Sequence, residues 1–138
     1  MKIFADTDIC LDLLTGRKPF NNIAEKLFTL ADLGKIKIHV SSLSFSNIDY
    51  LLKSQYKSNE SRKILLRFKT LVTVLAVDDK IIDLALASDF NDFEDALQNF
   101  SAEFQKEIHV IVTRNTKDFK TSSLSVMTPE TYLRSIQK

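Results

Sequence analysis

The chain enters its first apolar run at Ile3-Phe4-Ala5 and leaves it at Asp6-Thr7-Asp8. Three apolar residues are too few for a buried helix, so this run predicts a short β-strand. Asp6 and Asp8 then offer turn and capping oxygens for a helix that Gly16 ends. The order of strand, carboxylate and helix indicates an α/β fold in which acids stand at a strand end.

Later apolar runs predict the rest of the sheet. Residues 36–40, 71–75 and 108–112 are rich in β-branched side chains, and residues 124–127 add a short fifth candidate. Segments with apolar residues at helical spacing separate these runs. Strands that alternate with helices are joined by right-handed crossovers, which gives a parallel sheet covered on both faces.

Composition limits the class of protein. A length of 138 residues, 44% apolar and 27% charged, predicts one globular domain over residues 1–138. A net charge of +1 means that nucleic-acid binding needs a local basic patch. The single cysteine, Cys10, excludes an intramolecular disulfide and a Cys-rich zinc site. No apolar run approaches the roughly 20 residues of a membrane span, and no signal peptide precedes the first strand, so we expect a cytoplasmic protein.

A second group of acids opens the segment after Asn91. Asn91 or Asp92 suits the helix N-cap, and an acid at position 94 or 95 suits the capping box. Capping and the helix dipole account for one or two of these acids. They do not require four within seven residues, counting Asp89. Asp92 and Asp95 are three residues apart and share one helix face.

A third polar group follows the predicted strand over residues 108–112. Asn115 and Asp118 are ordinary turn formers, but Thr113 and Asn115 also suit a metal-bound water or a phosphate oxygen. The carboxyl ends of strands in an open α/β sheet converge on one crevice. Acids gathered there repel each other unless a divalent cation lies between them, and hard oxygen ligands suit Mg²⁺ or Mn²⁺. The pattern predicts metal-assisted phosphodiester chemistry.

Four motifs in this order resemble the PIN domain family, most closely its VapC-type toxin ribonucleases. They occupy residues 3–8, 40–50, 92–98 and 112–119, so the resemblance covers nearly the whole chain. It implies a three-layer α/β/α sandwich with a central parallel sheet of four to five strands. It also implies an endoribonuclease that depends on Mg²⁺ or Mn²⁺ and is the toxin of a type II toxin–antitoxin system. The implied partners are RNA, a small antitoxin protein and a second copy in a homodimer, with no membrane.

The resemblance also assigns roles to residues. The catalytic and metal-binding acids are Asp6, Asp95 and Asp118, and the supporting residues are Asp8, Asn47, Asp92, Thr113 and Asn115. Family members commonly carry Glu where this chain has Asn47, which brings an amide oxygen but no charge. Asp49 lies roughly 200° further around a helix and cannot substitute. Asp8 replaces the usual Asn and is a candidate to restore the charge.

Other interpretations stay open. Arg114 and Lys18 are candidates for phosphate contacts, with solvated surface charge as the alternative. Because of Asn47, the alternative function is a catalytically weakened PIN-like module that binds RNA or protein. A receiver domain also gathers acids at strand ends, but it needs a Lys directly after a late strand, and none follows Thr113 in this way. His39 and His109 lie within strand-like runs and are interpreted as structural.

Overall fold

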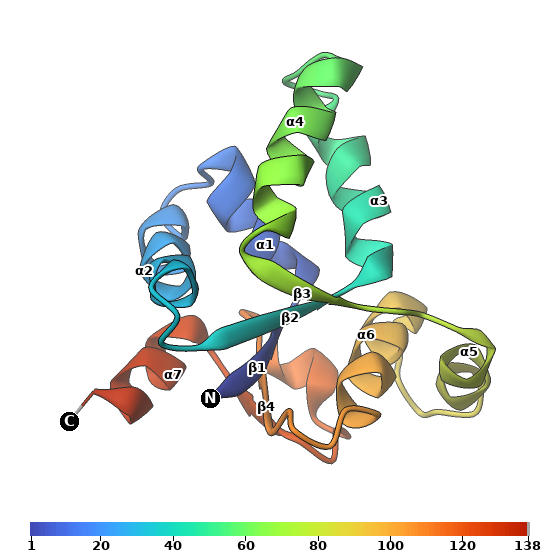
Figure 1. Cartoon of the computed structure of the whole chain (residues 1–138). Helices are drawn as coiled ribbons and strands as arrows, with labels where there is room; N and C mark the ends of the chain where they lie inside the picture. The colour runs from blue at the N-terminus through green and yellow to red at the C-terminus, as the bar shows by residue number, and fades with distance from the viewer. Residues whose placement is uncertain (138) are drawn as a thin grey trace.

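The computed structural model describes residues 1–137, and its centre is a five-stranded parallel sheet (Figure 1). The strands are β1 (Lys2–Ala5), β2 (Lys37–Ser41), β3 (Val72–Leu75), β4 (Val110–Val112) and β5 (Ser125–Met127). They lie in the order β3-β2-β1-β4-β5, and every neighbouring pair is parallel. The predicted parallel sheet, including its fifth strand, is therefore confirmed.

Helices connect the strands and cover both faces of the sheet. Within residues 1–137 they are α1 (Thr7–Thr15), α2 (Asn21–Asp32), α3 (Ser42–Leu52), α4 (Ser58–Lys69), α5 (Asp79–Leu86), α6 (Phe93–Glu103), the 3-10 helix η1 (Thr116–Phe119) and α7 (Pro129–Ile136). Figure 1 shows α3 and α4 rising together away from the sheet, while α5 and α6 lie on the opposite side from α2. None of these helices has the length and apolar character that crossing a membrane requires.

The central strand β1 is buried on both faces. Ile3 and Ala5 belong to one apolar core, which includes side chains of α1, α2, α3, α4 and α7. Phe4 points the other way and packs in a second core with Ile111 and Phe119. This alternation confirms the three-layer α/β/α arrangement. It also fixes the residues that directly follow β1 at the middle of the sheet edge.

Three predicted strands are shorter than their apolar runs, one of them being residues 124–127, of which only Ser125–Met127 form β5. Of residues 108–112 only Val110–Val112 form β4, because the amide of Ile108 donates to the carbonyl of Gln105 at 3.1 Å and closes a turn. Likewise, the amide of Leu71 donates to the carbonyl of Phe68 at 2.9 Å, so β3 begins one residue later. The apolar character of Ile108 and Leu71 is typical of a strand, but the backbone amides of both residues are already hydrogen-bonded within turns.

The structure agrees with the helix ends predicted at Gly16 and Asp92, and it adds a cap at Ser41. Gly16 adopts a left-handed conformation, with φ of 64°, just after α1. Ser41 caps α3 by accepting from the amide of Leu43 at 3.1 Å. Asp92 caps α6 by accepting from the amide of Glu94 at 3.2 Å. The starts of α1, α3 and α6 are thereby held close to the carboxyl edge of the sheet.

Candidate active site

Asp6 directly follows β1 and is only 4% exposed. It stands at the N-cap position of α1, yet its side chain makes no capping hydrogen bond. Instead its Oδ1 accepts from Nε2 of Gln98 at 3.0 Å, and its Oδ2 accepts from Oγ1 of Thr113 at 2.7 Å. Capping therefore does not explain this carboxylate, which side chains from α6 and from the end of β4 hold in place.

Gln98 on α6 is the residue that joins these segments. While its Nε2 donates to Asp6, its Oε1 accepts from the amide of Thr7 at 3.1 Å and from the hydroxyl of Thr7 at 3.2 Å. The Thr7 hydroxyl also contacts Oγ of Ser44 at 2.7 Å. This role of Gln98 was not predicted from the sequence. The available signal was its position three residues after Asp95, on the same face of the helix.

A cavity of about 520 Å³ opens above Asp6 at the carboxyl edge of the sheet. The three predicted catalytic acids, Asp6, Asp95 and Asp118, all line it, although they come from β1, α6 and η1. The predicted supporting residues lining it are Asp8, Asn47, Asp92 and Asn115. Thr113 is buried behind the cavity and acts on it through Asp6. Glu94 is a sixth acid of the lining that the sequence analysis did not select.

The negative charges in this cavity have no cation within its own lining, although Lys117 and Lys120 line an adjoining hollow that shares three of its acids. Within the described chain the lining of the cavity itself contains no Lys, Arg or His. Burial, followed by the charges of Asp6, Asp92, Asp118 and Glu94, raises the pKa of Asp95 to about 7. Burial also raises the pKa of Asp6, against the opposing effect of the Thr113 hydrogen bond. A cation added to the cavity would stabilise the ionised form of these crowded carboxylates.

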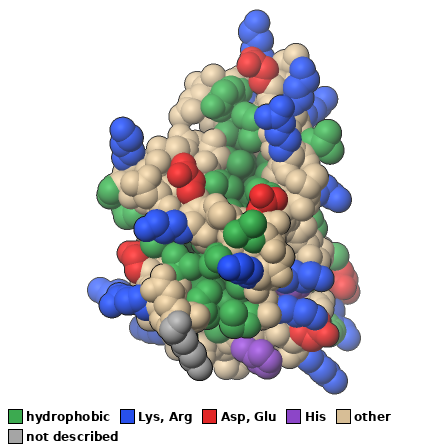
Figure 2. All heavy atoms as spheres, turned by 60° about the vertical axis from the view of Figure 1, so that its left-hand side comes forward, with side chains coloured by type: hydrophobic (Ala, Val, Ile, Leu, Met, Phe, Trp, Pro, Cys, Tyr) green, Lys and Arg blue, Asp and Glu red, His purple; other side chains and the backbone are tan. Residues whose placement is uncertain are grey.

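Basic side chains are spread over the face of the molecule that carries α2 and α7 (Figure 2). Figure 2 brings the α2 and α7 side forward and shows Lys and Arg side chains spread around a band of hydrophobic ones, with scattered acids. The net charge of +1 therefore hides an uneven distribution. Acids gather in the cavity, whereas basic residues lie elsewhere on the surface.

The donor chemistry of the cavity fits a hard divalent cation, although the side chains do not form a ready-made site. Among residues 1–137 no group of three or more Asp, Glu, His or Cys side chains is arranged to hold an ion. Carboxylate and amide oxygens are nevertheless the ligands that Mg²⁺ and Mn²⁺ prefer. A cation bound here would have to draw the carboxylates together, against the repulsion that raises the pKa of Asp95.

This repulsion predicts how stability depends on pH in the absence of metal. The folded protein keeps a proton on Asp95 up to a pKa of about 7, whereas the unfolded chain loses it near 3.8. The folded state therefore binds more protons in this window, and its stability should fall as the pH rises from about 4 to about 7. Urea unfolding in the presence of a chelator measures this fall. The Asp95→Asn variant should show a clearly smaller fall, and an unchanged one would contradict the prediction.

Asn47 on α3 faces the first turn of α6. Its Nδ2 donates a short hydrogen bond to Oε1 of Glu94. Burial and the charges of Asp92, Asp6 and Asp8 raise the pKa of Glu94. The sequence made Glu94 a candidate capping-box acid. In the structure its side chain contacts Asn47 at the edge of the cavity.

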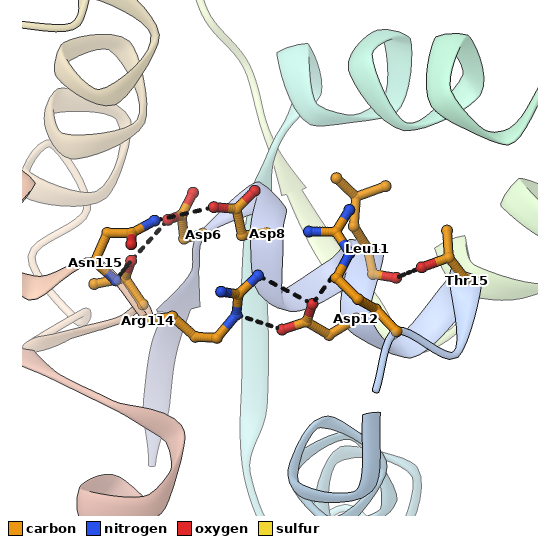
Figure 3. A network of polar contacts seen from close by, with 9 residues as sticks. Asp6, Asp8, Leu11, Asp12, Thr15, Arg114 and Asn115 are labelled. Atoms are coloured by element: carbon orange, nitrogen blue, oxygen red, sulfur yellow. Dashed lines mark hydrogen bonds and ion pairs between the residues drawn. The ribbon is translucent and has the colours of Figure 1, made fainter. Parts of the chain in front are cut away.

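Asn115 connects the end of β4 to the start of α1. Its amide donates to Oγ1 of Thr113 at 3.0 Å, and its Nδ2 donates to Oδ2 of Asp8 at 3.1 Å. Figure 3 shows Asn115 reaching to Asp8, whose carboxylate lies beside that of Asp6. Asp8 and Asn115 thus form one side of the cavity.

Arg114, a predicted candidate for a phosphate contact, pairs with an acid of α1 in the structure. Its Nε and Nη2 donate to the carboxylate of Asp12 at 2.8 and 3.2 Å (Figure 3). Its guanidinium also lies 3.9 Å from the ring centre of Phe20. Neither Arg114 nor Lys18 belongs to the cavity lining in the described chain. Arg114 instead ties the end of β4 to α1.

A family model described as a PIN domain matches residues 2–117. No curated protein sequence matches the chain. Several solved structures share its fold. A toxin–antitoxin complex from Klebsiella pneumoniae gives a TM-score of 0.68 at 21% identity, over 92% of this chain and 97% of that chain. VapBC from Salmonella typhimurium, solved bound to DNA, gives 0.68 at 18% identity, over 94% of this chain and 98% of that chain.

VapC20 from Mycobacterium tuberculosis, described as a toxin that cleaves the sarcin–ricin loop, gives a TM-score of 0.60 at 20% identity, over 79% of this chain and 86% of that chain. At these identities the solved structures establish a common fold. The family model reaches from β1 into η1 and covers every residue of the cavity lining except Asp118. The chain therefore belongs to the PIN domain family.

Proposed function

We propose that this protein is a metal-dependent endoribonuclease of PIN type and the toxin of a type II toxin–antitoxin system. The observation that carries the proposal is the cavity itself. Asp6, Asp95 and Asp118 reach it from three separate segments, and no basic side chain of the described lining neutralises them. Asp6 is buried and Asp95 half-buried, and like charges held close together with so little solvent are costly to a fold, so their presence favours a cation-binding role.

Mg²⁺ or Mn²⁺ would be held by Asp6, Asp95 and Asp118. When bound, such an ion activates a water molecule and stabilises negative charge on the phosphate. The chain supplies the orientation. Gln98 and Thr113 each donate to one oxygen of Asp6, so both carboxylate oxygens have fixed directions before any ion arrives. Asn115 restrains Asp8 at the cavity wall in the same way.

The rim of the cavity supports a single-stranded RNA substrate. Tyr50 and Leu51 on α3 line the cavity, yet they are 78% and 43% exposed. An exposed aromatic ring beside a phosphodiester-cleaving site suits stacking with an unpaired base. A base stacked on Tyr50 would place its backbone near the acids.

Replacing Tyr50 by Ala should weaken RNA binding without unfolding the protein. Base stacking on an aromatic side chain contributes about 1–3 kcal/mol, so we expect KM to rise roughly 10-fold with little change in kcat. Because the ring is exposed, thermal stability should stay close to wild type. Tyr50→Phe keeps the ring and is the matched control. Equal KM values for Tyr50→Ala and wild type would remove Tyr50 from the substrate path.

The direct test of the proposal is cleavage by purified protein. With Mn²⁺ or Mg²⁺ it should cut single-stranded RNA slowly, and a chelator should stop the reaction. Cleavage that survives chelation would show that the acids are not holding a catalytic ion.

The proposed partners are a small antitoxin, a second copy of the chain and RNA, all in the cytoplasm. Solved complexes that share this fold include VapBC pairs and a toxin–antitoxin complex, which supports an antitoxin partner. Exposed apolar side chains such as Leu51 on α3 and Leu66 on α4 support self-association. Light scattering at high concentration tests the homodimer, and co-purification with the product of a small neighbouring gene tests the antitoxin.

A catalytically weakened PIN module that binds RNA or protein is the second candidate. Asn47 and the lack of a ready-made metal cluster in the described chain favour it. A folded protein that binds RNA but cuts none with any divalent metal would select this alternative.

A further inference from the structure

Asn47 and Glu94 form a pair across the active-site cavity. Asn47 comes from α3 and Glu94 from the first turn of α6, and both line the cavity. The amide Nδ2 donates to Oε1 of Glu94. An uncharged side chain on α3 is thus in direct contact with a carboxylate that α6 delivers to the same place.

The carboxylate of Glu94 is not used to cap its helix. In α4, Glu60 bonds back to the backbone amide of Lys57 at 3.3 Å and completes a capping box. In α6 the N-cap is Asp92, so the capping-box position is that of Asp95, and Glu94 stands one residue nearer the start of the helix. Its side chain is directed instead to Asn47. The helix dipole favours an acid in this first turn, but it does not direct the side chain toward Asn47 on another helix.

The surroundings of Glu94 are those of a cation ligand. It is half-buried, and Asp92, Asp6 and Asp8 are the charges that act on it. Its hydrogen-bond partner is a neutral amide, which orients the group without neutralising it. Since the Asn47 amide engages Oε1, Oε2 is the oxygen that remains to bind a cation.

We propose that Glu94 on α6 supplies a metal-binding carboxylate of the cavity, and that Asn47, at the position where the family resemblance implies a Glu, is the positioning residue that holds it. The inference rests on the proposed metal-dependent function. Compared with a Glu at position 47, the negative charge then lies on the α6 side of the cavity and the neutral amide on the α3 side. The two side chains are still in contact. The site then has a full set of acids despite the Asn.

This arrangement determines what restoring the family residue would do. Asn47→Glu alone replaces a hydrogen-bond donor by a second carboxylate directly against Glu94, so it should not strengthen the site. Combining Asn47→Glu with Glu94→Gln exchanges the charge and the amide between the two walls. The double variant should therefore recover what Glu94→Gln loses.

Binding of Mn²⁺ to the metal-free protein, followed by calorimetry or by the electron spin resonance of free Mn²⁺, tests the proposal independently of activity. Glu94→Gln should weaken Mn²⁺ affinity roughly 10- to 100-fold. The double variant should return to within a few-fold of wild type. Glu25→Gln removes an exposed carboxylate of α2 outside the cavity and should leave the affinity unchanged. Urea unfolding of each variant shows that it is folded.

The outcomes separate this inference from the proposed function. Wild-type Mn²⁺ affinity in Glu94→Gln would overturn the role of Glu94, even if the protein cuts RNA. A gain in affinity from Asn47→Glu alone would overturn it too, because the charge would then belong on α3. If Mn²⁺ binding depends on Glu94 but the protein cuts no RNA, the role of Glu94 is supported and the proposed ribonuclease function is contradicted. A wild-type chain that binds no Mn²⁺ would overturn both.

Discussion

Asp95→Asn should reduce metal-dependent RNA cleavage by roughly 100-fold or more, because it removes a ligand and a charge from the cavity together. Asp6→Asn should have a similar effect. In that variant the introduced amide group would also place a donor against Gln98 Nε2 or Thr113 Oγ1, both of which donate to Asp6 in the structure. Asp95→Asn is the cleaner variant, since Asp95 is not locked between two donors. Single-turnover cleavage at saturating Mn²⁺ measures the effect.

The matched control for this experiment is Asp83→Asn, which neutralises an exposed acid of α5 outside the cavity lining. It should cut RNA at the wild-type rate. If Asp95→Asn and Asp83→Asn have equal activity, the cavity acids are not the catalyst. If Asp95→Asn loses activity but excess Mn²⁺ restores it, the main role of Asp95 is metal affinity.

Most of the sheet could be predicted because its information is local. The short β-branched runs and the caps at Gly16, Ser41 and Asp92 depend on neighbouring residues alone. The predicted start of the strand was less accurate at Ile108. This residue is buried like a strand residue, but its backbone amide completes a turn. Hydrophobicity records which residues are buried, whereas the partner of each amide is fixed by the path of the chain.

The site acids could also be predicted, because they follow strand ends or open a helix. Gln98 and Glu94 could not, since their roles depend on partners remote in sequence. Gln98 acts on Asp6 and Thr7, and Glu94 meets Asn47. A capping-box pattern is identical whether the acid turns back to its own helix or outward to another one. Only the packing of α3 against the start of α6 distinguishes the two cases.

Arg114 illustrates the opposite difficulty, because it lies inside a functional motif but has a structural role. Asp12 is 1% exposed, and Arg114 binds both of its carboxylate oxygens. Arg17 approaches the same carboxylate only at 3.9 Å. Nothing in the order of residues indicates that the side chain before Asn115 turns away from the cavity toward α1.

Arg114→Ala should therefore destabilise the protein by about 3 kcal/mol, since it leaves the buried Asp12 carboxylate without its main partner. The stacking of the guanidinium on Phe20 is lost as well. Arg17→Ala removes a distant, more exposed partner and should cost less than about 1 kcal/mol. Arg114→Lys keeps the charge but not the two-pronged contact, so its stability should lie between wild type and Arg114→Ala. Urea unfolding measures each value.

Adding Asp12→Asn to Arg114→Ala should recover part of the lost stability, because it removes the unpaired charge that the first change leaves behind. Such recovery is specific to a structural ion pair. A phosphate contact predicts the reverse pattern, in which Arg114→Ala unfolds at the wild-type urea concentration but binds RNA more weakly. That result would show that Arg114 contacts the RNA substrate and that its pairing with Asp12 does not stabilise the fold.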